Sequence, residues 1–287
     1  NRPCSFCAIP LMRGKHVSKS IEQVVTEAQN LAKNGTKELM LIAQDSTYYG
    51  IDLYGERKLK ELLEALSEVE GIEWIRLHYA YPSQFPSEIL PVMASKQSIC
   101  KYLDMPVQHI SDNVLKKMRR GITKRKTYEV LNEIKEKVPG ISLRTTLLVG
   151  HPGETEEDFE QLMKLVKEVK FDNSYCFTYS ERPGTPAANL VDDVPLAVKN
   201  DRLKRLVSQI DQHVLEINQS MVGKTEIAMV ESMARDGIHL QCRTENGRVA
   251  LINAGSDQAK RLIGKLMPVT FTEAMPHSLR GELMIQE

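Results

Sequence analysis

The sequence lacks an excess of charge, a long apolar run and the cysteine content of a disulfide scaffold. Its 38 basic and 38 acidic residues cancel, so the total charge gives no reason to expect a polyanionic partner, although a neutral total leaves room for a local patch. No run of eighteen apolar residues occurs, and so neither a membrane span nor a membrane partner is expected. The start has no signal-peptide pattern either. Five cysteines, an odd number in 287 residues, favour a reducing compartment, the cytoplasm.

The length and the hydrophobic content are those of a globular protein. With 41% hydrophobic residues in 287, the chain can bury one large core and a second, smaller one. It opens on Asn1, with no Met before it, and its most chemical-looking motif follows at once. We therefore expect the sequence to be part of a longer protein.

Helix-like and strand-like segments alternate between residues 20 and 180. Apolar residues at spacings of three and four indicate helices, and short apolar runs indicate buried strands. The expected helices cover residues 21–34, 59–66, 87–94, 111–118, 124–137 and 156–170. The expected strands cover residues 38–43, 74–78, 102–104, 142–149 and 173–179. Repeated β-α units predict an α/β fold with a parallel sheet, and periodicity leaves a partial (β/α) TIM-type barrel and a doubly wound sheet both open.

The alternation of expected helices and strands ends at Pro183, Gly184 and Pro186. A long amphipathic helix is expected over residues 196–221, and strand-like runs separated by turns follow at 225–230, 238–243, 249–252, 269–272 and 279–285. Five short strands predict a small antiparallel β-barrel of the oligonucleotide-binding (OB) type. The expected domains are therefore residues 1–220, which include the long helix, and residues 221–287.

The strongest chemical motif is the pair Cys4 and Cys7, separated by two residues. Such a pair fits half of a zinc site, a redox dithiol or part of an iron–sulfur site. Zinc needs four ligands, and no second pair with suitable spacing follows. The other cysteines, Cys100, Cys176 and Cys242, are isolated, and we interpret Cys100 and Cys176 as buried thiols in apolar strands.

The residues around this pair resemble the cluster loop of the radical S-adenosylmethionine (SAM) methylthiotransferases. Residues 4–14 read CSFCAIPLMRG, and a Ser-Lys-Ser stretch at 18–20 precedes a helix. The family motif has a further cysteine four positions before Cys4, which would stand directly before Asn1. The resemblance implies a radical SAM fold with a C-terminal TRAM barrel, and a 4Fe–4S cluster on Cys4, Cys7 and that third cysteine. The iron left without a protein ligand would chelate SAM, whose reductive cleavage gives a 5′-deoxyadenosyl radical.

Three further segments resemble the SAM-binding strand ends of this family. They are QDSTYYG at 44–50, YLDMPVQH at 102–109 and LRTTLLVGHPGE at 143–154. The implied cofactor-binding residues are Gln44, Asp45, Asp104, Gln108, His109, Arg144 and Gly150. Arg144 would pair with the SAM carboxylate. The alternatives are a helix-capping role for Asp45, a structural role for His109 and a salt bridge at the rim for Arg144. All these segments follow or end predicted strands, where the active sites of parallel barrels gather.

Family members modify either adenosine in transfer RNA or an aspartate of the small-subunit ribosomal protein S-twelve. Residues 4–14, 44–50 and 77–82 are most similar to the second kind. This similarity implies that the protein partner is S-twelve and that the reaction is methylthiolation of the aspartate β-carbon. It also implies an electron donor and a second 4Fe–4S cluster in an upstream domain. Residues 221–287 contain eight basic and eight acidic residues, so we expect this barrel to bind RNA weakly. A transfer-RNA methylthiotransferase and a zinc-stabilised binding module are the alternatives.

Overall fold

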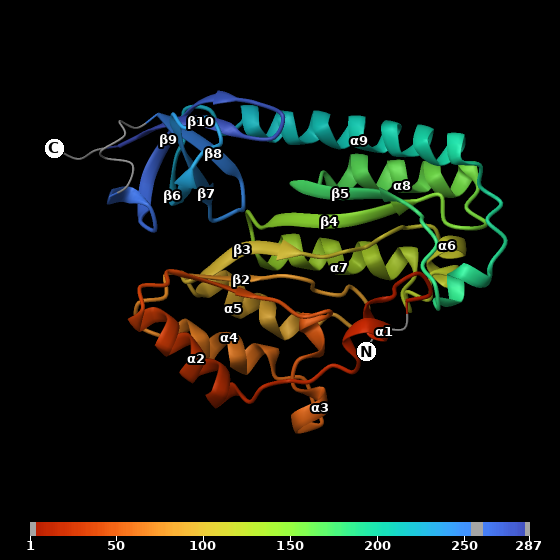
Figure 1. Cartoon of the computed structure of the whole chain (residues 1–287), viewed down its shortest axis with the longest axis horizontal. Helices are drawn as coiled ribbons and strands as arrows, with labels where there is room; N and C mark the ends of the chain where they lie inside the picture. Colours follow the sequence, from red (N-terminus) through yellow and green to blue (C-terminus); the bar gives the residue numbers. More distant parts are fainter. Residues whose placement is uncertain (1–3, 254–260, 285–287) are drawn as a thin grey trace.

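Five parallel strands in sequential order form the first sheet of the molecule (Figure 1). The computed structural model describes residues 4–253 and 261–284. The strands of this sheet are β1 (Glu38–Leu41), β2 (Trp74–Leu77), β3 (Ile99–Asp104), β4 (Ser142–Val149) and β5 (Asn173–Thr178). A doubly wound sheet reverses its strand order at a switch point. The order β1-β2-β3-β4-β5 has no such reversal, and the open, barrel-like alternative is the one the chain adopts.

Helices precede or connect the strands, and the longer ones cover one face of the sheet. They are α1 (Ile9–Arg13), α2 (Ile21–Lys33), α3 (Ile51–Tyr54), α4 (Leu59–Ser67), α5 (Leu90–Ser95), α6 (Asp112–Lys117), α7 (Lys124–Lys137) and α8 (Glu156–Val169). Capping boxes at Ser20 and Thr155 begin α2 and α8. The apolar faces of α4, α5, α7 and α8 form one core with the strands, because each amphipathic helix must bury its apolar stripe.

The other face of the sheet is partly open. Tyr175 and Phe177 on β5 are 50% and 53% exposed, and Met40 on β1 is 46% exposed. The side chains of β5 alternate between this face and the helix-covered one, as the two-residue period of a strand requires. The open face is thus lined in part by aromatic side chains.

Helix α9 (Leu196–Gln219) packs along β5 and α8 and leads into a second sheet. That sheet is a closed barrel in the order β10-β8-β7-β6-β9. Its strands are β6 (Thr225–Met233), β7 (His239–Thr244), β8 (Val249–Asn253), β9 (Leu266–Ala274) and β10 (Leu279–Leu283). The end of the strand expected over 279–285 lies outside the described residues.

The predicted five-stranded barrel is confirmed, with one difference in strand direction. Four neighbouring pairs are antiparallel, but β8 and β10 run parallel. Strand directions cannot alternate around a closed ring of five, because an odd ring must contain at least one parallel pair. The sequence pattern alone does not reveal this consequence of closure.

Buried ion pairs attach the barrel to the first sheet at the N-terminal ends of its strands. Glu38, the first residue of β1, accepts hydrogen bonds from Arg76 Nε at 2.7 Å and from Arg243 Nη1 of β7 at 2.9 Å. Arg248, which precedes β8, pairs with Asp172 just before β5. The barrel therefore lies at the opposite end of the strands from the loop that carries Cys4 and Cys7 (Figure 1).

In the described ranges, 4–253 and 261–284, no helix combines the length and the apolar character that crossing a membrane requires.

Candidate active site

A cavity of about 540 Å³ lies on the open face of the first sheet, toward the C-terminal ends of its strands. Its lining comes from the cysteine loop, from the segments after β1, β2 and β3, and from β4 and β5. Six residues predicted from the sequence are among those that line it: Cys4, Cys7, Gln44, Asp104, Gln108 and Arg144. Residues spread over 140 positions of the chain therefore converge on one cavity of the size that small-molecule ligands occupy.

The loop that carries Cys4 and Cys7 is held in place by Ser5. The Ser5 backbone N–H donates to the Met118 carbonyl at 3.0 Å and its hydroxyl donates to the Lys117 carbonyl at 2.7 Å. The Ser5 carbonyl accepts a third bond from the N–H of Ala187 at 2.8 Å. Cys4 is buried and Cys7 is half-buried, and burial raises the pKa of the Cys7 thiol.

His78, Asp104 and Arg144 form a row across three neighbouring strands. Leu77 aligns with Leu103, and Asp104 aligns with Arg144. His78 just after β2, Asp104 at the end of β3 and Arg144, the third residue of β4, are therefore neighbours in space. Arg144 Nη2 lies 2.8 Å from Asp104 Oδ2 and 3.0 Å from His78 Nδ1. Burial acts to raise the pKa of Asp104, but the neighbouring His78, 3.8 Å away, and the hydrogen bond and charge of Arg144 outweigh it and the net pKa is lowered. The carboxylate is therefore ionised.

Two tyrosine rings enclose the guanidinium of Arg144. Its central carbon lies 5.0 Å from the ring centre of Tyr175 and 5.8 Å from that of Tyr102, within the range of a cation–π contact. One hydrogen-bond donor and one acceptor nevertheless remain without a partner. Arg144 Nε and Asp104 Oδ1 are buried and have no hydrogen-bond partner among the described residues. Buried polar atoms normally find partners, so a ligand with polar groups would satisfy them.

Backbone strain accompanies this site. Gln108 and Tyr79 both line the cavity with positive φ angles, 68° and 56°, which are unfavourable for residues other than glycine. Gln108 is fixed there by hydrogen bonds with β4, from its N–H to the Thr146 carbonyl and from the Leu148 N–H to its own carbonyl, both at 2.8 Å. Such strain concentrates at functional sites.

Two residues that the sequence did not point to contact the sulfur of Cys4. Tyr81 Oη and Arg120 Nη1 each lie 3.2 Å from Cys4 Sγ, and Arg120 is 4% exposed. Arg120 follows Lys116, Lys117 and Arg119 at the end of α6, where basic residues normally favour the helix dipole. No pattern in the sequence separates the one buried cation from its exposed neighbours.

Three predicted cofactor residues are not among those that line the cavity. The Asp45 carboxylate accepts from the Thr47 N–H at 3.0 Å and caps the short helix η1 (Ser46–Tyr48). His109 is fully buried, and burial lowers its pKa to about 3. Its Nδ1 accepts from the N–H of Ser111 at 3.1 Å. For these two residues the structure provides structural roles, and their part in cofactor binding stays a prediction.

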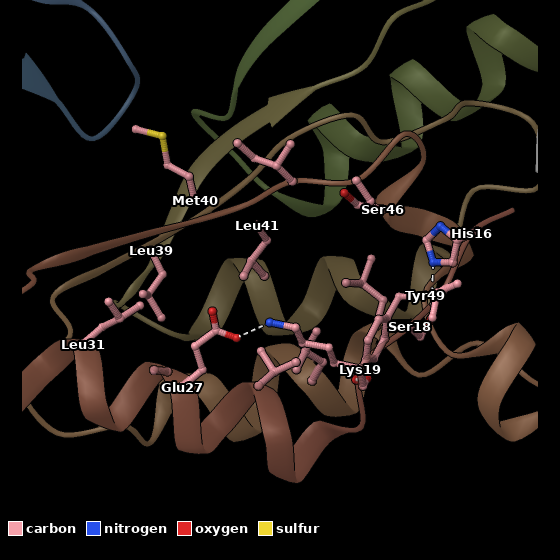
Figure 2. A pocket seen from close by; sticks show the side chains of 17 residues that line it. His16, Ser18, Lys19, Glu27, Leu31, Leu39, Met40, Leu41, Ser46 and Tyr49 are labelled. Atoms are coloured by element: carbon pink, nitrogen blue, oxygen red, sulfur yellow. Dashed lines mark hydrogen bonds and ion pairs between the residues drawn. The ribbon is translucent and has the colours of Figure 1, made fainter. Parts of the chain in front are cut away.

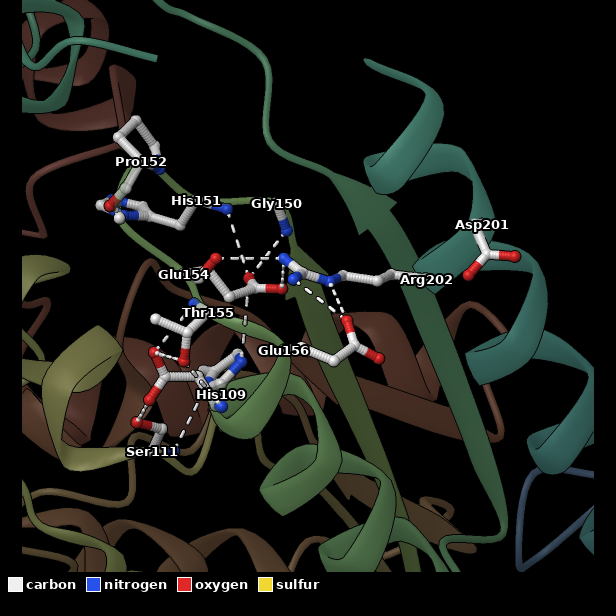
Figure 3. Close-up of polar contacts among 12 residues, drawn as sticks. His109, Ser111, Gly150, His151, Pro152, Glu154, Thr155, Glu156, Asp201 and Arg202 are labelled. Atoms are coloured by element: carbon white, nitrogen blue, oxygen red, sulfur yellow. Dashed lines mark hydrogen bonds and ion pairs between the residues drawn. The ribbon is translucent and has the colours of Figure 1, made fainter. Parts of the chain in front are cut away.

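Gly150 belongs to a buried polar cluster next to His109 (Figure 3). Its N–H donates to Glu154 Oε2 at 2.7 Å, and Glu154 Oε1 accepts from Arg202 of α9 at 3.0 Å. Gly150 has φ 74°, and a Cβ there would lie 2.3 Å from Lys199 Cγ. Close packing against α9 therefore requires glycine at this position, and the predicted contact of Gly150 with a cofactor is untested.

A second cavity, of about 350 Å³, lies between α2, α4 and the edge strand β1 (Figure 2). Its walls are mostly apolar side chains of these elements, such as Ala28, Leu39 and Leu62. The polar groups at its margin pair with one another, as Lys19 does with Glu27 at 2.6 Å. It lacks the converging polar groups that distinguish the first cavity, and we do not treat it as an active site.

The first cavity fits an iron–sulfur cluster in the chemistry of its donors. Cys4 and Cys7 supply soft thiolate ligands, which iron–sulfur clusters select. In residues 4–253 and 261–284, no group of three or more His, Cys, Asp or Glu side chains could hold a metal ion. The third cysteine expected before Asn1, together with residues 1–3, lies outside the described residues. Cys4 and Cys7 therefore stay predicted ligands.

Comparisons with known proteins identify the family of the chain. The model of the radical SAM superfamily matches residues 1–166. A curated relative from Flavobacterium johnsoniae, ribosomal protein uS12 methylthiotransferase RimO, is 50% identical over 98% of this chain and 65% of its own length. A relative of the same name from Cytophaga hutchinsonii is 46% identical over 99% of this chain and 65% of its own length. The chain thus spans 65% of the length of these relatives.

Solved structures with the same fold are more distant in sequence. Coproporphyrinogen III oxidase from Escherichia coli, a radical SAM enzyme, has a TM-score of 0.55 at 17% identity, over 94% of this chain and 63% of that one. The radical SAM methyltransferase TsrM from Kitasatospora setae has a TM-score of 0.53 at 20% identity, over 65% of this chain and 36% of that one. At these identities the likeness establishes the fold alone.

Proposed function

The function that we propose rests on one established fact. The chain belongs to the radical SAM superfamily, whose model matches more than half of it. Within that superfamily, we assign it the catalytic part of a methylthiotransferase that modifies an aspartate of ribosomal protein uS12. The observation that carries the assignment is the convergence of Cys4, Cys7, Gln44, Asp104, Gln108 and Arg144 on one cavity. The 50% identity to a uS12 methylthiotransferase over nearly the whole chain supports the choice of substrate.

The two cysteines have the role of cluster ligands in this proposal. Cys4 and Cys7, with a third cysteine, hold a 4Fe–4S cluster that, when bound, supplies the electron for the cleavage of SAM. Ser5 fixes the loop between them through its three hydrogen bonds to α6 and to residue 187.

Arg144 and Asp104 have the role of orienting SAM. Arg144 presents a guanidinium whose Nε is unpartnered among the described residues, and Asp104 presents an unpartnered carboxylate oxygen. A guanidinium suits the SAM carboxylate, and a carboxylate suits an ammonium or hydroxyl group. The side-chain amides of Gln44 and Gln108 add neutral donors and acceptors to the same wall.

The open face of the sheet supports a macromolecular substrate. The exposed aromatic side chains of Tyr79, Tyr175 and Phe177 border the cavity and leave it accessible from one side. A loop of a folded protein can reach the SAM-binding wall only if the cavity is accessible in this way. The aspartate of uS12 would then lie near the cluster end.

The remaining components belong to the whole protein. Because the chain spans 65% of the length of its relatives, we assign sulfur delivery and a second 4Fe–4S cluster to a domain outside the chain. An electron donor completes the system. The balanced charge of residues 221–287 supports weak RNA binding and disfavours transfer RNA as the substrate.

The test uses the full-length enzyme that contains this chain, prepared without oxygen. It is incubated with SAM, a low-potential one-electron reductant, and either the small ribosomal subunit or transfer RNA, and each product is examined by mass spectrometry. We expect a methylthio increment on an aspartate of uS12, its loss in Cys7→Ala, and its retention in the matched control Cys176→Ala, since Cys176 does not line the cavity. A methylthio group on transfer RNA, with uS12 unmodified, would refute the substrate assignment.

A further inference from the structure

One buried cation in the cavity has no role in the function proposed above. Arg120 is 4% exposed and lies in the cavity wall beside Cys4. A buried guanidinium is costly unless an anion or several acceptors compensate it. Among the salt bridges of the described residues, none joins Arg120 to a carboxylate. Its charge is therefore available to a different anion in the cavity.

The position of Arg120 is fixed from three sides. Its Nη1 donates to Cys4 Sγ at 3.2 Å and its Nη2 donates to the carbonyl of Pro106. Its guanidinium carbon lies 4.0 Å from the ring centre of Tyr81, a close cation–π stack. A planar guanidinium held by these three contacts cannot rotate out into solvent. The fold therefore fixes its contact with Cys4.

Tyr81 makes a second contact with the same sulfur. Its hydroxyl lies 3.2 Å from Cys4 Sγ and 3.2 Å from the carbonyl of Arg120. While Cys4 is a thiol, the S–H can donate to the tyrosine oxygen, and the O–H can donate to the carbonyl. Once the sulfur is a thiolate it has no proton to donate, and the O–H of Tyr81 turns toward it. The cysteine sulfur then accepts two hydrogen bonds.

We propose that Arg120, together with Tyr81, is a positioning residue that sets the reduction potential of the iron–sulfur cluster held at Cys4. The inference rests on the proposed function, since it requires that cluster. Reduction places one electron from a low-potential one-electron donor on the cluster and breaks no bond. Because a nearby positive charge and hydrogen bonds to ligand sulfur favour the more negative, reduced state, Arg120 and Tyr81 raise the potential.

The experiment measures midpoint potentials in the full-length protein, without SAM, by anaerobic titration followed by electron paramagnetic resonance. Because that protein is proposed to hold a second cluster, the signal of the cluster at Cys4 is identified as the one that Cys7→Ala removes. Arg120→Gln removes the charge, Arg120→Lys retains it, and Tyr81→Phe removes only the hydroxyl. Arg119→Gln is the matched control, because Arg119 is the neighbouring residue and is exposed. We expect Arg120→Gln to make reduction about tenfold less favourable, a shift of about 59 mV to more negative potential for one electron.

The variants separate this inference from the proposed function. Arg120→Lys is expected to recover most of the shift, Tyr81→Phe to produce a smaller shift of the same sign, and Arg119→Gln to produce none. A wild-type protein with no cluster signal that depends on Cys7 would refute the proposed function. A wild-type cluster with an Arg120→Gln midpoint equal to or above its own would refute the inference alone. If Arg120→Gln does not retain the cluster, the Tyr81→Phe midpoint decides, and an unchanged value refutes the inference.

Discussion

The guanidinium of Arg144 is held between a carboxylate and two aromatic rings, with its Nε left for a ligand. We predict that Arg144→Lys weakens SAM binding about tenfold or more, because the charge remains but the planar fork is lost. A hydrogen bond to a charged group contributes about 1.5–3 kcal/mol, and about 1.4 kcal/mol corresponds to a tenfold change in affinity. Calorimetric titration of the cluster-loaded protein with SAM measures the effect.

A surface arginine provides the control for this substitution. Arg205 pairs with Glu156 between α8 and α9 and is 40% exposed, so Arg205→Lys should leave SAM affinity unchanged. Arg144→Ala is expected to lower stability as well, because it leaves the buried Asp104 carboxylate without its cation. SAM affinity that is the same in wild type and Arg144→Lys would exclude Arg144 from the binding site.

Gln44 and Asp45 show which kind of neighbours the sequence could not separate. Gln44 and Asp45 are consecutive, yet only Gln44 lines the cavity, while Asp45 caps a helix. Both residues lie in the irregular connection after β1, where the direction of a side chain follows no fixed period. A motif that spans both residues therefore identifies the segment but not the residue that contacts the ligand.

Helix α9 meets the end of β4 through Gly150. We predict that Gly150→Ala lowers the free energy of unfolding in two ways. The positive φ of 74° is unfavourable for alanine by about 1–2 kcal/mol, and the new Cβ would lie 2.3 Å from Lys199 Cγ and 3.1 Å from Lys199 Cβ. Overpacking of this kind typically costs a further amount of about 1–3 kcal/mol. Chemical denaturation of the variant measures the sum.

A second glycine isolates the packing contribution. Gly140 has φ 79°, and a Cβ there would have nothing within 4 Å, so Gly140→Ala should show the backbone cost alone. Lys199→Ala in the Gly150→Ala background should recover part of the loss, because it removes the atoms that collide. Equal destabilisation by Gly140→Ala and Gly150→Ala would show that contact with α9 does not matter at this position.

At the scale of the whole molecule, Glu38 connects the barrel to the first sheet. Burial acts to raise its pKa, but hydrogen bonds from Arg243 and the charge of Arg76 outweigh it, and the pKa is lowered from its ordinary value of 4.5. Because the folded-state pKa is depressed, this stabilisation is complete above about pH 4.5 and is lost as the pH falls through the folded-state pKa. The docking of the barrel should weaken on acidification.

We predict that Glu38→Gln destabilises the protein by about 3–5 kcal/mol near neutral pH, since it leaves buried arginines without their anion. It should also remove this part of the pH dependence below about pH 4.5. Urea unfolding between about pH 3 and pH 7, a range that includes the transition, tests both effects. Glu73→Gln is the control, because Glu73 is 51% exposed in its pair with Lys37 and surface pairs contribute little. An unchanged pH profile in Glu38→Gln would contradict the assignment.

The ion pairs between the barrel and the first sheet reduce the positive charge that the barrel can offer to RNA. Arg243 and Arg248, two of its eight basic residues, are engaged with Glu38 and Asp172 of the first sheet. We therefore predict weak binding of transfer RNA by the full-length enzyme at physiological salt, with a shallow dependence on salt, and binding of uS12 that salt affects less. Titration of each partner at low and physiological salt measures this. Tight, strongly salt-dependent binding of transfer RNA without binding of uS12 would favour the RNA substrate.

The sequence by itself determined the elements and their type. Apolar spacings of three and four marked α2, α7, α8 and α9, and short apolar runs marked the strands of both sheets, because these patterns follow from local backbone geometry. The same local signals predicted a parallel sheet followed by a small barrel. The cysteine motif with its flanking residues also indicated the family and the cavity-lining Cys4 and Cys7.

Only the tertiary structure decided which side chains meet. His78, Asp104 and Arg144 come together through the register of three strands, and Tyr81 and Arg120 reach Cys4 from positions 77 and 116 residues away. The parallel β8–β10 pair exists because a five-stranded barrel must close. Register and closure depend on contacts between distant segments, and no local pattern of apolar and polar residues encodes them.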